Sequence, residues 1–195
     1  MWVNHDLKIV FVATPKCGST SMINSLGFEY NSETPREYHA SIDMVHARHP
    51  ESKEYKSFSF VRNPWDRFVS VYKDGTQSRG HLGAWSSGLL KYKNFTDFAK
   101  NFEKSEWVNE VHFLPCCSFL KTNGKISVDN IGRFENLHND FSKITKEIVG
   151  SSVNIKHHHN QTKRSKDYKE YYNEETSEIV RRLYKEDIET FNYEY

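Results

Sequence analysis

The chain has 195 residues and carries 27 Lys and Arg against 26 Asp and Glu, so its formal net charge is +1. This length suits a single domain, which we predict over residues 1–195, and it is sufficient to bury a core. The balanced charge argues against nucleic acid as a partner. The three cysteines are too few, and odd in number, for a disulfide framework.

No stretch of the sequence approaches the ~20 consecutive apolar residues of a membrane span. The start of the chain lacks the basic and apolar regions of a signal peptide. We therefore expect a cytoplasmic protein with no membrane span, or a chain from which an anchor has been removed.

The first predicted element is a strand over residues 7–13 (LKIVFVA). This nearly continuous apolar run contains several β-branched residues, which is typical of a strand buried on both faces of a parallel sheet. A turn follows at residues 14–18. The spacing of Met22, Ile23 and Leu26 predicts a short helix over residues 19–26 that ends at Gly27.

A second strand is predicted over residues 57–61 (SFSFV), and a helix follows it directly. Asn63 is a favourable N-cap and Pro64 is favoured at the first helical position. The helix is expected to place one set of residues on its apolar side (Trp65, Phe68, Val69 and Tyr72) and another set on a different side (Asn63, Asp66, Arg67 and Ser70).

The rest of the chain continues this alternation. A long loop is predicted over residues 74–90, and short helices are predicted over residues 95–102 and 105–112. A strand is predicted over residues 126–134 and a last helix over residues 174–189. Helical spacing of Leu137, Phe141, Ile144 and Ile148 predicts a further helix after the third strand. The order predicts an α/β fold, a P-loop-like domain with a central parallel sheet flanked by helices.

Ligands of such sheets bind where strand carboxyl ends meet helix N-termini, so the first two strand–helix junctions are candidate sites. At the first, Lys16 supplies a positive charge and Gly18 lets the backbone approach an anion. Ser19, Thr20 and Ser21 add hydroxyl donors. The segment is not a Walker A loop, because no lysine directly follows its last glycine. A capped turn without a ligand is the alternative.

At the second junction, Arg62 ends the strand and Ser70 lies two turns into the helix. An arginine can grip a phosphate through a fork of donors, and a serine can add one more. In the alternative, Arg62 forms a structural pair with Asp66.

Taken together, PKCGSTS after the first strand and RNPWDRFVSVY after the second resemble the motifs of the PAPS-dependent sulfotransferases. The sequences of the two motifs are most similar to those of the membrane-type carbohydrate sulfotransferases and their short bacterial-like relatives. Three further segments resemble that group: HFLP from His112, DNIGRFENLHNDF from Asp129, and the C-terminal SEIVRRLYKEDIETFNYEY.

This resemblance implies that the co-substrate is PAPS (3′-phosphoadenosine 5′-phosphosulfate), without a metal, and that the acceptor is a hydroxyl, in particular that of a glycan. It implies that Lys16 contacts the bridging oxygen and the leaving 5′-phosphate. It also implies that Arg62 and Ser70 contact the 3′-phosphate. The 5′-phosphate would be held by residues Cys17, Gly18, Ser19, Thr20 and Ser21. Thr162 and Arg164 would contact PAPS from a basic covering loop, for which a solvated charged loop is the alternative.

Sulfuryl transfer to an alcohol also needs a base for the hydroxyl proton. His39 lies between the two motifs, in a stretch similar to the one in which heparan-type 2-O- and 6-O-sulfotransferases carry their catalytic histidine. We predict His39 as the base, with His46 and His112 as the second and third candidates.

The sequence departs from the family pattern at Cys116, where related sequences often have Gln, and in its short length. Both leave the acceptor open. Four residues could line a sugar site or could equally anchor loops: Arg79, His81, Trp85 and Trp107.

Other chemistries fit less well. The three histidines at positions 157–159 with Cys116 and Cys117 match no standard zinc site. A cysteine phosphatase built on Cys17 would need an arginine at position 23, which is Ile23. A nucleotide-dependent small-molecule kinase and a non-catalytic PAP- or PAPS-binding protein are the rival functions.

Overall fold

The computed structural model describes residues 1–28, 35–77, 88–155, 165 and 167–195. The chain divides into two compact units, Met1–Arg62 with Pro115–Asn160 (unit 1) and Asn63–Leu114 with Gln161–Tyr195 (unit 2). A single domain over residues 1–195 stays a prediction.

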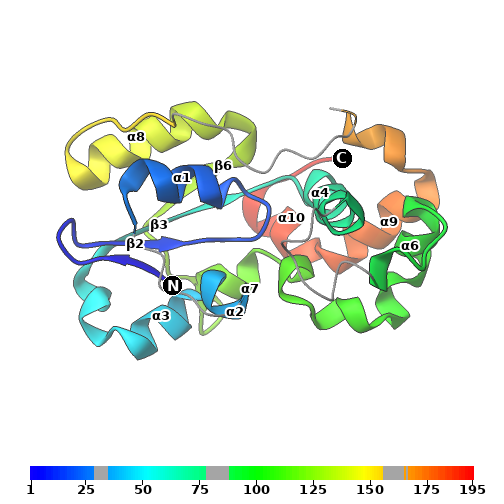
Figure 1. Cartoon of the computed structure of the whole chain (residues 1–195), viewed down its shortest axis with the longest axis horizontal. Coiled ribbons are helices and arrows are strands. Elements are labelled where there is room, and N and C mark those ends of the chain that lie inside the picture. The colour runs from blue at the N-terminus through cyan, green and yellow to red at the C-terminus, as the bar shows by residue number, and fades with distance from the viewer. Residues whose placement is uncertain (29–34, 78–87, 156–164, 166) are drawn as a thin grey trace. The chain divides into compact units, whose positions relative to one another are not determined.

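Unit 1 is built on a four-stranded sheet in the order β1-β2-β3-β6 (Figure 1). Its strands are β1 (Trp2–Asn4), β2 (Ile9–Val12), β3 (Lys56–Val61) and β6 (Asn130–Arg133). The pairs β2–β3 and β3–β6 are parallel, and only the edge strand β1 is antiparallel. The α/β fold with a mostly parallel central sheet is confirmed, and every residue of β2 is buried, as the apolar run predicted.

Helices flank this sheet (Figure 1). The helix α1 (Ser19–Leu26) has the predicted bounds and ends at Gly27, and α8 (Leu137–Val149) follows β6 through the 3₁₀ helix η5 (Phe134–Asn136). Phe141 of α8 packs on the sheet, with ring centroids 6.5 Å from Phe58 and 6.4 Å from Phe60. The short helices α2 (Pro35–Tyr38), α3 (Ile42–Arg48) and α7 (Cys117–Leu120) and the 3₁₀ helix η1 (Pro50–Glu54) complete unit 1.

The strand predicted over residues 126–134 is divided. Its start belongs to β5 (Lys125–Ile126), which pairs with β4 (Lys121–Thr122) in a separate hairpin. Only β6 joins the central sheet. Between the two, the Asp129 carboxylate accepts hydrogen bonds from Ser57 N (2.7 Å) and Ser57 Oγ (2.8 Å), which fixes the point where β6 begins beside β3.

Unit 2 is helical. It contains α4 (Pro64–Gln77), α6 (Phe95–Asn101), α9 (Glu174–Leu183) and α10 (Lys185–Phe191), with the 3₁₀ helices η2 (Phe102–Lys104), η3 (Glu106–Asn109), η4 (Val111–Phe113) and η6 (Tyr168–Tyr171). Three predictions need correction. Residues 74–77 continue α4 instead of forming a loop, residues 105–112 form 3₁₀ turns, and the last helix breaks at Tyr184.

Aromatic rings fill the core of unit 2. Phe68 of α4 stacks on Phe98 (5.4 Å between centroids) and meets Phe102 and Phe113 edge-on at 5.2 and 5.6 Å. The predicted apolar side of α4 is therefore confirmed, since its four members all belong to this core cluster.

The second predicted set on α4 is also largely buried, and its member Arg67 is 1% exposed. Its guanidinium donates to the carbonyls of Leu114 (2.9 Å) and His112 (3.3 Å) and lies 4.0 Å from the Asp187 carboxylate. Burial is tolerated because these oxygens replace water around the charge.

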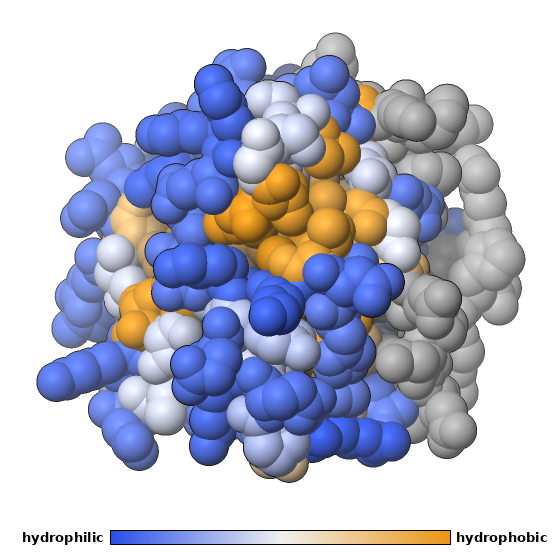
Figure 2. All heavy atoms as spheres, turned by 90° about the vertical axis from the view of Figure 1, so that its left-hand side faces the viewer, coloured by the Kyte–Doolittle hydropathy of each residue, from blue (hydrophilic) through white to orange (hydrophobic). Residues whose placement is uncertain are grey.

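Leu7, in the turn between β1 and β2, is 44% exposed. Figure 2 views the end of the molecule where this turn lies and shows an apolar patch among hydrophilic side chains. Among the described residues, no helix has the length and apolar character needed to cross a bilayer.

Candidate functional site

The turn between β2 and α1 contains two residues with positive φ. Lys16 has φ +63° and Gly18, the N-cap of α1, has φ +83°. Positive φ values turn successive N–H groups toward one side, and the first N–H groups of a helix lack acceptors within that helix. The half-buried Lys16 adds a positive charge to this turn. The turn therefore fits an anionic group such as a phosphosulfate.

The neighbours of Gly18 also favour a residue without a side chain. A Cβ at this position would lie 3.2 Å from Leu137 Cδ2 and 3.5 Å from Phe134 Cδ2. The loop is thus packed closely against Phe134 and the start of α8, and a side chain at Gly18 would require the Leu137 side chain to shift by a few tenths of an ångström.

The hydroxyl residues of the loop lie at the start of α1. Ser19 and Ser21 are 7% and 4% exposed, and Ser21 N donates to the Gly18 carbonyl at 3.2 Å. Thr20 Oγ1 lies 3.3 Å from the Tyr38 hydroxyl. The loop is therefore linked to the segment that precedes His39.

His39 is held at the carboxyl end of β2. Its Nδ1 lies 2.5 Å from the Ala13 carbonyl oxygen, and its side chain is largely buried. A carbonyl only accepts, so Nδ1 carries the hydrogen, and in the neutral ring Nε2 carries the lone pair. This is the tautomer that a base acting through Nε2 needs.

The edge strand fixes the segment around His39. Trp2 Nε1 donates to the Tyr38 carbonyl at 2.9 Å, and the Trp2 and Tyr38 rings meet edge-on at 4.9 Å. The ring of Tyr38 in turn lies 4.7 Å from that of His39. These contacts limit the orientations open to the imidazole.

Arg62, at the end of β3, contacts the same loop. Its Nη1 donates to the Lys16 carbonyl at 2.9 Å, and its guanidinium stacks over the Phe134 ring at 3.9 Å. The side chain is 6% exposed. Arg62 therefore supports Lys16 directly, a role that neither sequence interpretation included.

The family model described as the sulfotransferase family matches residues 1–194. The chain belongs to the sulfotransferase family. It is also 34% identical, over 98 residues, to a protein of Archaeoglobus fulgidus described as uncharacterized; the match covers 48% of this chain and 68% of that protein. Family membership supports sulfuryl transfer as the activity and a hydroxyl as the acceptor.

Cys17 of this sulfotransferase is 1% exposed, and its Sγ lies 3.5 Å from the Pro15 carbonyl. The thiol is turned into unit 1, which disfavours a cysteine nucleophile in this loop. Any contact of Cys17 with the donor would come from its main chain.

The other candidate bases have different surroundings. Partial burial lowers the pKa of His46 on α3, and the charge of Lys53 lowers it further against an opposing effect of Asp43. His112, in unit 2, is 5% exposed and its Nδ1 lies 3.0 Å from Glu110 Oε1. The His39 ring contacts the Ala13 carbonyl, directly after the strand that leads into the Lys16 loop.

The remaining predicted site residues lie elsewhere. Ser70 is 5% exposed on α4 of unit 2, so its joint action with Arg62 stays a prediction. Trp107 packs in the aromatic core of unit 2, which favours its role as an anchor. Five of the predicted site residues lie outside the part of the chain that the structure describes: Thr162, Arg164, Arg79, His81 and Trp85.

Proposed function

We propose that this sulfotransferase moves a sulfuryl group from PAPS to a hydroxyl of a carbohydrate and releases PAP. The hydrogen bond from His39 Nδ1 to the Ala13 carbonyl carries the proposal. It supports a base held beside the strand that enters the Lys16 loop, in the tautomer that carries its hydrogen on Nδ1. The carbohydrate acceptor rests on the resemblance of the two motifs.

PAPS supplies the sulfuryl group and, as the 5′-phosphate of PAP, a leaving group of low basicity. In the proposed reaction His39 Nε2 takes the hydroxyl proton while the acceptor oxygen forms its bond to sulfur. The bond from sulfur to the bridging oxygen breaks. Lys16 and the amides at the start of α1 stabilise the charge that grows on the departing phosphate, so catalysis is by positioning and electrostatics.

In the same proposal, Arg62 and Ser70 bind the 3′-phosphate of PAPS. Arg62 combines a planar fork of donors with stacking on Phe134, which limits its conformations and so reduces the entropy lost on gripping a phosphate. Thr162 and Arg164 would close over the nucleotide. No step of this reaction calls for a metal.

Thermal unfolding with nucleotides tests the donor. PAP should raise the melting temperature clearly, as any ligand of the native state does, and ATP with Mg²⁺ should raise it much less. Equal or greater stabilisation by ATP would favour a kinase and overturn the proposal.

Transfer of ³⁵S from labelled PAPS to a panel of glycans and small alcohols tests the reaction. We expect labelled product with at least one glycan. Tight PAP binding without transfer to any panel member would favour a non-catalytic PAP- or PAPS-binding protein. Labelling of small alcohols alone would retain the sulfotransferase and reject the carbohydrate.

A further inference from the structure

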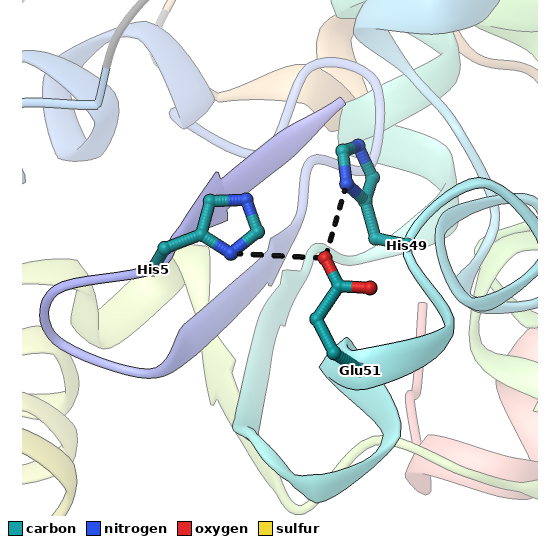
Figure 3. A group of neighbouring side chains, drawn as sticks. All are labelled: His5, His49 and Glu51. Atoms are coloured by element: carbon teal, nitrogen blue, oxygen red, sulfur yellow. Dashed lines mark ion pairs between the residues drawn. The ribbon is translucent and has the colours of Figure 1, made fainter.

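Three potential metal ligands converge in unit 1, apart from the Lys16 loop. They are His5, His49 and Glu51, and their ligand atoms all lie within 4.8 Å of one another (Figure 3). The Nδ1 atoms of His5 and His49 lie 3.8 and 3.6 Å from the same oxygen, Glu51 Oε1. His5 comes from the turn between β1 and β2, and the other two from the start of η1.

The backbone that carries His49 is fixed on both sides. His49 N donates to the Val45 carbonyl at 2.8 Å and caps α3. Its own carbonyl accepts from Ser52 N at 2.9 Å and from Ser52 Oγ at 2.6 Å, and Ser52 is fully buried. A site on such a backbone loses little entropy when it closes around an ion.

The turn that carries His5 is fixed as well. Leu7 N donates to Asn4 Oδ1 at 2.9 Å within the turn, and Lys56 N donates to the Lys8 carbonyl at 3.1 Å. The second bond joins the turn to the start of β3, which directly follows η1. The two elements that supply the ligands are therefore joined through their backbones.

The His5 ring is also oriented. Its Nδ1 lies 3.1 Å from the Tyr55 hydroxyl, and the two rings meet at a centroid distance of 5.8 Å and an angle of 79°. Tyr55 thus directs Nδ1, rather than Nε2, toward Glu51.

We propose that His5, His49 and Glu51 bind Zn²⁺ or a similar first-row divalent cation. Bonds of about 2.0–2.2 Å in a tetrahedral zinc site place neighbouring ligand atoms about 3.4 Å apart. The observed separations of 3.6 and 3.8 Å from Glu51 Oε1 are close to this value, and side-chain movements would bring all three ligand atoms, which lie within 4.8 Å of one another, into this geometry. Binding replaces the contact between His5 and Tyr55 by a metal bond, and water completes the coordination.

The ligand set selects the ion. Two imidazole nitrogens and one carboxylate suit zinc and its neighbours, whereas Mg²⁺ and Ca²⁺ prefer oxygen ligands throughout. The side chains of His5 and Glu51 are 52% and 51% exposed, so an ion can enter from solvent. The bound cation would tie the β1–β2 turn to η1 and stabilise the native state. This site does not depend on the proposed sulfuryl transfer.

The experiment uses the full chain without a polyhistidine tag, with residues His157, His158 and His159 changed to Ala to remove the other histidine cluster. Zinc titration against a chromogenic indicator should give one ion per chain, and zinc should raise the melting temperature where Mg²⁺ does not. His5→Ala, His49→Ala and Glu51→Gln should each weaken zinc binding at least about tenfold.

His46→Ala is the matched control, because His46 lies on α3 close to His49 in sequence and outside the proposed ligand set. It should keep the affinity of the parent, and circular dichroism should report folded protein for every variant. The proposal is overturned if the parent binds no zinc, or if its affinity survives all three ligand substitutions. It is also overturned if His46→Ala lowers the affinity as much as His49→Ala.

Discussion

The side chain of Arg62 donates a hydrogen bond of 2.9 Å to the main-chain carbonyl of Lys16. This bond joins the first residue of the second motif to a residue of the first motif, 46 positions earlier in the chain. It also supports a residue with φ +63°, a backbone conformation that is unfavourable for most residues other than glycine. In the proposed function, the same arginine would therefore act both on the nucleotide and on the Lys16 loop.

Arg62→Ala should separate these two effects. PAP binding should weaken by about 1.5–3 kcal/mol, the range for a hydrogen bond to a charged group. Adenosine 5′-phosphosulfate, which lacks the 3′-phosphate, should lose only about 0.5–1.5 kcal/mol, because it feels the loosened loop alone. Isothermal titration with both ligands measures the difference. Equal losses would mean that Arg62 acts only through Lys16.

Two substitutions of Lys16 separate the role of its charge in catalysis from the effect of its backbone strain on stability. Lys16→Gly and Lys16→Ala both remove the ammonium group, so both should abolish most of the turnover. Only glycine relieves the positive φ, and we expect Lys16→Gly to be more stable than Lys16→Ala by about 0.5–1 kcal/mol. Urea unfolding compares the two. A glycine variant less stable than the alanine variant would refute this assignment of strain.

His39→Ala and His39→Asn test the base. Both should lower turnover by about 10²–10⁴-fold and leave PAP affinity nearly unchanged. Asparagine offers an amide donor in place of Nδ1 and should retain more of the stability that the bond to Ala13 provides. A phenol acceptor, which loses its proton more readily, should partly rescue both variants but not Lys16→Ala.

His46→Ala, at the second candidate base, belongs to the same series and should keep most of the turnover. Near-normal rates for His39→Ala on the true acceptor would reject His39 as the base; a loss in His46→Ala would then favour His46, and otherwise His112 would be tested next.

Glu110 should make stability depend on pH. Burial raises the pKa of its carboxyl, but the hydrogen bonds and charge of His112 outweigh burial and hold the pKa below its ordinary value of 4.5. A lowered pKa in the folded state means that this group stabilises the fold above the ordinary value, and that the contribution is lost as pH falls through the folded-state pKa.

Unfolding of Glu110→Gln and the parent should therefore differ most above about pH 5 and converge as the pH falls below the ordinary carboxyl value. The pH-dependent part should shrink when the comparison is repeated in a His112→Ala background. A difference that stays constant from pH 3 to pH 7 would contradict this explanation.

Local pattern was enough to determine most of unit 1. The apolar run before the first motif and the spacing of Met22, Ile23 and Leu26 correctly predicted β2 and α1, because a strand buried on both faces and a one-sided helix each leave a periodic signature. The two motifs likewise led to the sulfotransferase family. The pattern did not predict β1, α2 and α3, because these elements are too short to show a clear period. It also predicted one strand over residues 126–134, where the structure has parts of two strands that belong to different sheets.

Contacts between distant segments were decided only by the tertiary structure. Nothing in the sequence placed His39 against the Ala13 carbonyl, buried Arg67 beside Asp187, or brought His5 to Glu51. Such contacts depend on how strands pair and helices pack, and a side chain's polarity does not say whether a partner will meet it in the interior. The sequence by itself therefore determined the family, and the tertiary structure decided which distant residues contact each other, such as His39 and Ala13.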